Sequence, residues 1–267
     1  MADYLSLVAA ANAAAYDRYL GPPQFEPYAR DLAGRLGAMT DGDLLETAAG
    51  TGVLTRVLAR TLPEAVRIVA TDLNPARLDY AAAQPGATRV SWQQADALAL
   101  AFENASFDAV VSQFGVMFFP DKIAGYREAL RVLRPGGRFL FNVWDRIEAN
   151  ELNVVFNQVL ATQFSQDPPQ LLAPFQYHQP DTIADEVRCA GFHSVAVESL
   201  ELINTVPFSR DLAIGFCQGT TLAGDIESRR PGGLAGVTEN VAAGLAARLG
   251  TGPIAGRMRA YVVSASR

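Results

Sequence analysis

Residues 44–52 read Leu-Leu-Glu-Thr-Ala-Ala-Gly-Thr-Gly, and the fold of the chain can be worked out from this stretch outward. The stretch starts with an apolar pair that is typical of a buried strand, and the residues at 53–59 that follow it predict a helix. Gly50 and Gly52 have no Cβ, so a ligand can approach the backbone closely. The N–H groups at the start of the next helix favour negatively charged ligand groups. The order of strand, acidic residue, small-residue loop and helix therefore predicts a ligand-binding loop.

Further strands and helices alternate around this loop. We predict strands at 42–47, 67–71, 88–92, 107–112 and 138–143, with helices at 53–61, 75–83 and 120–133. Elements at this spacing predict a parallel sheet with helices on both faces. Four polar residues fall at or just after the carboxyl end of a predicted strand: Glu46, Asp72, Asp96 and Gln113. Because ligands bind outside the carboxyl ends of such strands, we expect these four side chains to form a binding site.

The segments on either side of this core are less regular. Helices are expected at 3–20 and 25–38, and Gly21-Pro22-Pro23 is expected to end the first, because proline cannot continue a helix interior. After residue 145 we predict a helix at 180–190, a strand at 193–203, helical pieces within 208–256 and a final strand at 258–264. We expect one domain over 1–267, with an N-terminal helical lid at 1–40, a binding core at 41–145, and insertions at 146–179 and 208–256 that form a substrate cap.

The composition disfavours several classes of function. The net charge of the 267 residues is −6, whereas an exposed nucleic-acid footprint normally needs a basic face. The two cysteines and two histidines lack the spacing of metal ligands, so we expect no metal site. We expect neither a signal peptide nor a membrane span, since no run of about 20 apolar residues occurs. These features predict a cytoplasmic protein that acts on a small molecule, and they leave its oligomeric state open.

The order of the elements resembles the class I S-adenosylmethionine-dependent methyltransferases, most closely the small-molecule group that includes the ubiquinone/menaquinone biosynthesis enzymes. The resemblance covers residues 16–145 well and extends weakly to the C-terminus. It implies a Rossmann-like, doubly wound, mostly parallel seven-stranded sheet with an antiparallel last strand. It also implies S-adenosylmethionine as the cofactor and S-adenosylhomocysteine as its product.

The resemblance assigns the loop to the cofactor. The residues implied are Glu46 in the family's acidic place, followed by Thr47, Ala48, Gly50 and Gly52. The family's first motif has three glycines at alternate positions, and Ala48 stands where the first is usual. Alanine is expected to be tolerated there if its φ angle is negative.

The other implied cofactor contacts follow along the chain. Asp72 resembles the residue that accepts hydrogen bonds from both ribose hydroxyls, and Leu73 would flank the adenine. Asp96 would take the adenine amino group, while the backbone of Ala97 would read a ring nitrogen. The remaining implied contacts are Gln113 and Phe114 near the transferable methyl group, and Tyr16 and Tyr19 in a segment that folds over the cofactor. The turn at 134–137, Arg-Pro-Gly-Gly, is also typical of the family.

Methyl transfer from a sulfonium needs positioning more than catalytic side chains. His178 is the candidate general base, and the competing interpretation is a surface or capping histidine. Asp145 and Glu148 could also face the acceptor. The aromatic residues within 150–178 favour an apolar or aromatic acceptor, whereas ordinary core packing is the stronger explanation for each of them taken singly; the insertion as a whole is expected to cover the site.

Two alternatives remain open from the residues. A nicotinamide-dependent oxidoreductase would have a G-x-G-x-x-G loop, but positions 50, 52 and 55 are Gly, Gly and Thr. A protein that binds S-adenosylmethionine without transferring its methyl group would share the same motifs, because a fold does not establish an activity.

Overall fold

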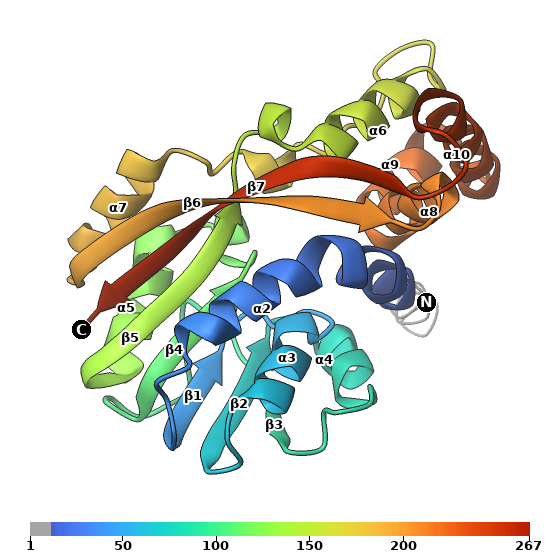
Figure 1. Ribbon diagram of the computed structural model, residues 1–267. Coiled ribbons are helices and arrows are strands. Elements are labelled where there is room, and N and C mark those ends of the chain that lie inside the picture. The colour runs from blue at the N-terminus through green and yellow to red at the C-terminus, as the bar shows by residue number, and fades with distance from the viewer. Residues whose placement is uncertain (1–11) are drawn as a thin grey trace. The chain divides into compact units, whose positions relative to one another are not determined.

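The computed structural model describes residues 12–267 (Figure 1). Its N-terminal and central elements are η1 (Gly21–Phe25), α2 (Glu26–Arg35), β1 (Gly42–Glu46), α3 (Val53–Thr61), β2 (Val66–Asp72), α4 (Pro75–Ala82), β3 (Val90–Gln94), β4 (Phe107–Gln113), η2 (Val116–Phe118), α5 (Lys122–Val132) and β5 (Leu133–Trp144). The remaining elements are η3 (Ile147–Ala149), α6 (Glu151–Ala161), η4 (Ala173–Phe175), α7 (Pro180–Cys189), β6 (His193–Val206), α8 (Ser209–Gly219), α9 (Leu222–Arg229), α10 (Leu234–Leu249) and β7 (Ile254–Ser266). The predicted alternation of strands and helices is confirmed.

The strands form one seven-stranded sheet in the order β3-β2-β1-β4-β5-β7-β6. β1 pairs in parallel with both β2 and β4, and Glu46 lies opposite Ala70 on one side and Val111 on the other. β4 and β5 are also parallel, whereas β7 runs antiparallel to β5. The Rossmann-like, doubly wound sheet with an antiparallel last strand is therefore confirmed. Its strand order reverses between β1 and β4, which is where such sheets bind ligands.

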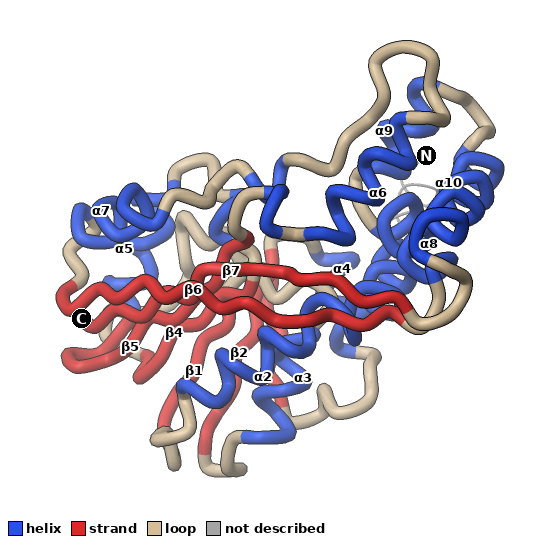
Figure 2. The backbone as a smooth tube through the Cα atoms, turned by 45° about the horizontal axis from the view of Figure 1, so that its top comes forward, coloured by secondary structure: helices blue, strands red, loops and turns tan. Residues whose placement is uncertain are grey.

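The two central strands are covered on both faces. Leu44 and Leu45 of β1 and Val110 and Val111 of β4 are all 0% exposed. α2 and α3 lie on one face of these strands, and α5 and α7 lie on the other (Figures 1 and 2). Burial of this kind is typical of parallel strands and fixes where β1 and β4 end. The loops that follow β1 and β4 therefore start from strand ends that are packed on both faces.

The Gly-Pro-Pro segment does not end the first helix, contrary to expectation. Residues 12–20 are helical and lead directly into the π-helical turn η1, which leads into α2. The N–H of Glu26 bonds the carbonyl oxygen of Gly21, five residues back. Pro22 and Pro23 have no N–H to donate, and they are the second and third residues of the wider turn. Residues 3–11 of the predicted helix lie outside the described part of the chain.

The turn at 134–137 lies within the bounds of β5 as an outward bulge. The pairing of β4 with β5 passes from Phe107 opposite Leu133 to Ala109 opposite Arg138. Two steps along β4 therefore match five along β5, so the four residues of the predicted turn stand opposite Asp108 alone. Gly136 has a φ of +81°, which glycine adopts without a steric penalty.

The chain divides into two compact units. The core unit comprises Tyr28–Asp145, Pro174–Leu200 and Ala260–Arg267. The helical unit comprises the described residues up to Pro27, together with Arg146–Ala173 and Glu201–Arg259. Within the helical unit, Phe156 stacks near Phe216 with ring centroids 4.6 Å apart. Among residues 12–267, no helix is both long and apolar enough to cross a membrane.

Candidate functional site

The loop after β1 has an unusual backbone. Ala48, Gly50 and Gly52 have φ angles of +55°, +58° and +79°. The expectation that Ala48 is tolerated through a negative φ is therefore wrong, because this alanine adopts the left-handed conformation that usually favours glycine. Non-glycine residues held in this region are strained and are concentrated at functional sites.

Hydrogen bonds from both neighbouring strands hold this loop. On the β4 side, the N–H of Thr47 bonds the carbonyl oxygen of Val111 at 2.9 Å. On the β2 side, the N–H of Ala49 bonds the carbonyl oxygen of Thr71 at 2.9 Å. The N–H of Gly50 donates to Asp72 Oδ2 at 2.7 Å. The loop is therefore a preformed cradle at the switch point of the sheet.

Glu46 ends β1 beneath this cradle, and its side chain is almost wholly buried, with 1% exposed. Its Oε2 atom has no hydrogen-bond partner among the described residues. Burial raises the pKa of Glu46 to about 8; the charge of Asp72 acts in the same direction, while Thr55 and Arg56 oppose it. A buried carboxyl group with an unsatisfied oxygen is costly unless a donor or a cation meets it. Glu46 is thus suited to receive a positively charged ligand group.

Asp72 ends β2, and its side chain links the end of that strand to the loop after β1. Its Oδ1 accepts the N–H of Asn74 at 2.9 Å, and its Oδ2 holds Gly50 as described above. The next side chain, Leu73, is 64% exposed, although leucine is usually buried. The structure therefore brings Asp72 beside the loop and leaves Leu73 on the surface after the strand end, while their ribose and adenine roles stay predictions.

Asp96 lies in an exposed turn after β3. Its Oδ1 accepts the N–H of Leu98 at 2.9 Å, and Asp96 forms an isolated bridge with Ala99. The N–H of Ala95 bonds the carbonyl oxygen of Asp72 at 3.1 Å, which ties this turn to the end of β2. Ala97 is half-buried in the same turn. The adenine roles of Asp96 and Ala97 stay predictions.

Gln113 ends β4 on the other side of the loop, and Phe114 follows it. Phe114 has a φ of +50°, and its N–H donates to Asn142 Oδ1 at 2.9 Å. Its ring stacks on Trp144, with centroids 3.8 Å apart and planes 10° from parallel. Tyr28 meets the edges of both rings, at 5.4 and 5.1 Å. An aromatic cluster therefore lies at the carboxyl ends of β4 and β5.

The sequence analysis did not single out Asn142, Trp144 or Tyr28. Asn142 is a lone amide within the apolar strand Phe139–Trp144, and it is 0% exposed. Trp144 ends β5 at the same sheet edge as Glu46 and Asp72. Both signals were present in the sequence, because a polar residue inside a buried strand needs a partner.

His178 lies between η4 and α7 in the core unit. Its Nδ1 is 2.7 Å from the carbonyl oxygen of Phe175. A ring nitrogen that faces a carbonyl oxygen carries the proton, so the neutral tautomer leaves Nε2 as an acceptor. Phe175 in turn lies near Trp144, with centroids 6.4 Å apart. His178 is therefore two contacts from the aromatic cluster.

The remaining predicted residues are distributed over both units. Tyr16 and Tyr19 belong to the helical unit, where Tyr16 stacks on Phe25 at 4.9 Å and Arg18 lies over the ring of Tyr19 at 5.3 Å. Glu148 is exposed in that unit, whereas Asp145 is buried at the end of the core unit's first segment. The cofactor roles of Tyr16 and Tyr19 stay predictions.

Comparisons with known proteins agree with this geometry. A methyltransferase-domain family model matches residues 44–137. The chain is 32% identical over 167 residues to the demethylmenaquinone methyltransferase of Deinococcus radiodurans, and the alignment covers 57% of this chain and 68% of that protein. It is 41% identical over 98 residues to the malonyl-[acyl-carrier protein] O-methyltransferase of Hahella chejuensis, covering 37% of this chain and 35% of that one. The chain thus spans only about a third of the latter relative.

A solved structure with the same fold is phosphoethanolamine N-methyltransferase 2 of Haemonchus contortus, in complex with phosphomonomethylethanolamine and S-adenosylhomocysteine. The TM-score is 0.60 at 19% identity, and the alignment covers 96% of this chain and 56% of that chain. The fold and the cradle together define an α/β protein with a preformed loop at the switch point of its sheet. The chain belongs to the S-adenosylmethionine-dependent methyltransferases. The alternative of a nicotinamide-dependent oxidoreductase is thereby overturned.

The residues present fit S-adenosylmethionine. A Cβ added at Gly50 would have only Arg77 Nη1 nearby, at 3.9 Å, so the backbone there is open to close approach. The unsatisfied oxygen of Glu46 suits the cationic methionine portion, and the carboxylate of Asp72 suits hydroxyl donors. When bound, the cofactor supplies an electrophilic methyl group on its sulfonium. The loop, Glu46 and Asp72 would hold and orient it.

Proposed function

We propose that this enzyme transfers the methyl group of S-adenosylmethionine to a small, apolar or aromatic molecule. The observation that carries the proposal is the aromatic cluster of Tyr28, Phe114 and Trp144 beside the cofactor loop. The three rings are 0%, 5% and 3% exposed, so they form an apolar wall at this edge of the sheet, and apolar surroundings favour planar or apolar ligands over strongly charged ones.

Two further observations support this acceptor class. A relative that the chain matches over 68% of its length has a name that gives a quinone, demethylmenaquinone, as its substrate. The net charge of −6 favours a small acceptor over a nucleic acid. Among the insertion aromatics, Phe156 adds no support, because it is 0% exposed and packs against Phe216 as core of the helical unit.

The chain's contribution to catalysis is mainly the holding of two reactants in line. Positioning of this kind is worth about 7–11 kcal/mol of the barrier. The loop after β1, which is hydrogen-bonded to both β2 and β4, orients the cofactor. The segment after β4 lies beside this loop. An acceptor that must lose a proton also needs a base.

His178 is the base that we propose, acting through Nε2. Replacing it with glutamine keeps a polar side chain and removes the titratable group. We expect kcat to fall by about 10²-fold or more while KM for the cofactor stays unchanged, since a general base typically contributes about 10²–10⁴-fold. An unchanged kcat would assign His178 to the structural role of capping the Phe175 carbonyl.

A methyl-transfer assay with labelled S-adenosylmethionine tests the proposed function. The acceptor panel contains hydroquinones and phenols, aliphatic and aromatic amines, thiols, and RNA as a macromolecular control. We expect transfer to members of the aromatic set. Transfer confined to RNA or to aliphatic amines would contradict the acceptor class without affecting the assignment to the methyltransferase family.

A second candidate function is cofactor binding without transfer. The observation that favours it is Ala48, which stands at a usual glycine position and has a φ of +55°. This candidate predicts that S-adenosylhomocysteine binds tightly in calorimetry while no member of the panel accepts a methyl group. Labelled product with any panel member would exclude it.

A further inference from the structure

We propose that Ala48 and Gly115 form a steric lock that sets the spacing between the cofactor loop and the segment after β4, which makes Gly115 a positioning residue. A Cβ added at Gly115 would lie 2.5 Å from the Cβ of Ala48. It would also lie 2.9 Å from Ser112 Oγ. The methyl group of Ala48 therefore occupies the space that a side chain at 115 would need.

The requirement for glycine at 115 is one of space and not of backbone conformation. Gly115 has a φ of −100° and a ψ of −45°, which any residue can adopt. At Ala48 the situation is reversed, because its φ of +55° suits glycine better than alanine. The chain thus has a methyl group at Ala48, where the backbone conformation disfavours one. It has none at Gly115, where the backbone conformation would permit one.

Hydrogen bonds and ring packing with neighbouring strands fix both Ala48 and Gly115, so neither residue can move away from the other without breaking these contacts. Ala48 lies between the hydrogen bonds from Thr47 to Val111 and from Ala49 to Thr71, both 2.9 Å long. Gly115 follows Phe114, whose N–H is bound by Asn142 Oδ1 and whose ring is stacked on Trp144. Ser112 Oγ also donates to the carbonyl oxygen of Thr47 at 3.0 Å, which joins the two segments a second time. A methyl group added at 115 would push the cofactor loop and the Gln113–Phe114 segment apart.

The lock rests on the proposed use of both segments for the cofactor. Its test uses S-adenosylhomocysteine, which needs no acceptor, so a wrong acceptor class would leave the result unchanged. The variants are Gly115→Ala, Ala48→Gly and the double variant, with calorimetric Kd as the readout. Gly34→Ala in α2 is the matched control, because nothing lies within 4 Å of a Cβ added there.

We expect Gly115→Ala to weaken binding at least about tenfold, the scale of an overpacked buried contact. Gly34→Ala should stay within about twofold of the wild type, and Ala48→Gly alone provides the reference Kd for the double variant. The double variant should recover at least about threefold of the loss, because the first clash is gone and only the end of the Ser112 side chain remains. A loss of affinity at an unchanged Tm is not expected if Gly115 only supports folding.

Thermal unfolding measured beside each Kd separates positioning from loss of fold. If Gly115→Ala does not fold, the double variant decides the question, since the lock predicts that Ala48→Gly restores both folding and binding. Unchanged binding in Gly115→Ala would overturn the lock. A double variant that binds no better than Gly115→Ala would also overturn it.

Discussion

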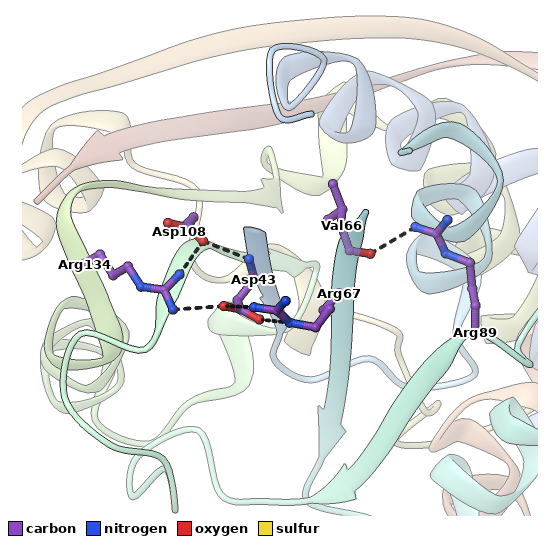
Figure 3. A network of polar contacts seen from close by, with 6 residues as sticks. All are labelled: Asp43, Val66, Arg67, Arg89, Asp108 and Arg134. Atoms are coloured by element: carbon purple, nitrogen blue, oxygen red, sulfur yellow. Dashed lines mark hydrogen bonds and ion pairs between the residues drawn. The ribbon is translucent and has the colours of Figure 1, made fainter. Parts of the chain in front are cut away.

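Strand β1 carries a carboxyl group near each end, and the two groups lie in opposite environments: one is paired with arginines and the other is buried with an unsatisfied oxygen. At the amino edge, Asp43 accepts two hydrogen bonds from Arg67, at 2.6 and 2.7 Å, and one from Arg134 at 2.9 Å (Figure 3). Arg134 also pairs with Asp108, whose carboxylate accepts the N–H of Asp43 at 2.8 Å. Arg67 chiefly, together with Arg134, holds the pKa of Asp43 below its ordinary value.

At the carboxyl edge, Glu46 is three residues further along the same strand. It is buried, one of its oxygens is unsatisfied among the described residues, and its pKa is raised to about 8. The backbone beside it adopts left-handed conformations at Ala48 and Phe114. The amino edge satisfies its own charges, while the carboxyl edge keeps a buried, unsatisfied carboxyl group and two residues in strained backbone conformations. We infer that the satisfied edge serves folding and that the unsatisfied edge serves binding.

The largest expected effect at the carboxyl edge comes from Asp72→Ala. The substitution removes the implied ribose acceptor and also releases the N–H of Gly50. Hydrogen bonds to charged groups are worth about 1.5–3 kcal/mol, so the Kd for S-adenosylhomocysteine should rise about 10- to 150-fold.

Calorimetry measures this effect, with Asp79→Ala as the matched control. Asp79 is an exposed residue of α4 in the same unit, and its replacement should leave the Kd within about twofold. If Asp72→Ala and the wild type bind S-adenosylhomocysteine with equal affinity, Asp72 does not bind the ribose. The proposal that the carboxyl edge of the sheet serves binding would then lose support.

The second prediction concerns the pH dependence of binding. If a cationic ligand group meets Glu46, the ligand binds the ionised form, and binding lowers a pKa that is about 8 in the unliganded protein. Affinity for S-adenosylhomocysteine should therefore rise with pH below about 8, by up to about tenfold per pH unit. Glu46→Gln should flatten this dependence.

Calorimetry in buffers of different ionisation enthalpy gives the proton count directly. The wild type should release close to one proton on binding near pH 7, and Glu46→Gln should release less. Binding that is equally steep in pH for both proteins would mean that Glu46 does not face the ligand.

The same carboxyl group makes a prediction for the unliganded protein. Its folded pKa is raised above the unfolded value, so the folded state holds an extra proton in the window between roughly 4.5 and 8. The free energy of unfolding should consequently fall as pH rises through this window. Urea unfolding at several pH values measures the slope, and Glu46→Gln should reduce it.

The carboxyl edge could be predicted from the sequence because it follows from strand order. Glu46 and Asp72 each end a strand of dense apolar residues, and parallel strands bring such ends together. The helix after the loop was also predicted, since its apolar residues recur with a helical period. Each of these inferences depends on neighbours along the chain.

The details that the sequence did not reveal depend on neighbours in space. The φ of Ala48 is set by hydrogen bonds from β2 and β4, and the need for glycine at 115 arises from a methyl group 67 positions earlier. The Gly-Pro-Pro segment was predicted as a helix end, because the wider turn that accommodates it is rare. The aromatic cluster was missed for the same reason, since Tyr28, Phe114 and Trp144 come from three separate elements.

The smallest expected effect is at the amino edge, and it is the sharpest check on the comparison. Asp43→Asn should lower stability by about 1 kcal/mol, or about 2–4 °C in Tm, because partly exposed ion pairs contribute little individually. The Kd for S-adenosylhomocysteine should stay within about twofold of the wild type, since no cofactor contact is implied at that edge. Asp185→Asn serves as the control, because its pair with Arg188 is exposed on α7 and should contribute less.

The pH dependence at this edge should have the opposite window to that of Glu46. The pKa of Asp43 is lowered, so its stabilisation is present above the ordinary aspartate range and is lost as pH falls through the depressed pKa. Wild type and Asp43→Asn should therefore differ in Tm at pH 6 and converge in strong acid. A loss of ligand binding in Asp43→Asn at full stability would show that the amino edge also governs the site. That result would contradict the inference that the amino edge serves folding alone and the carboxyl edge serves binding.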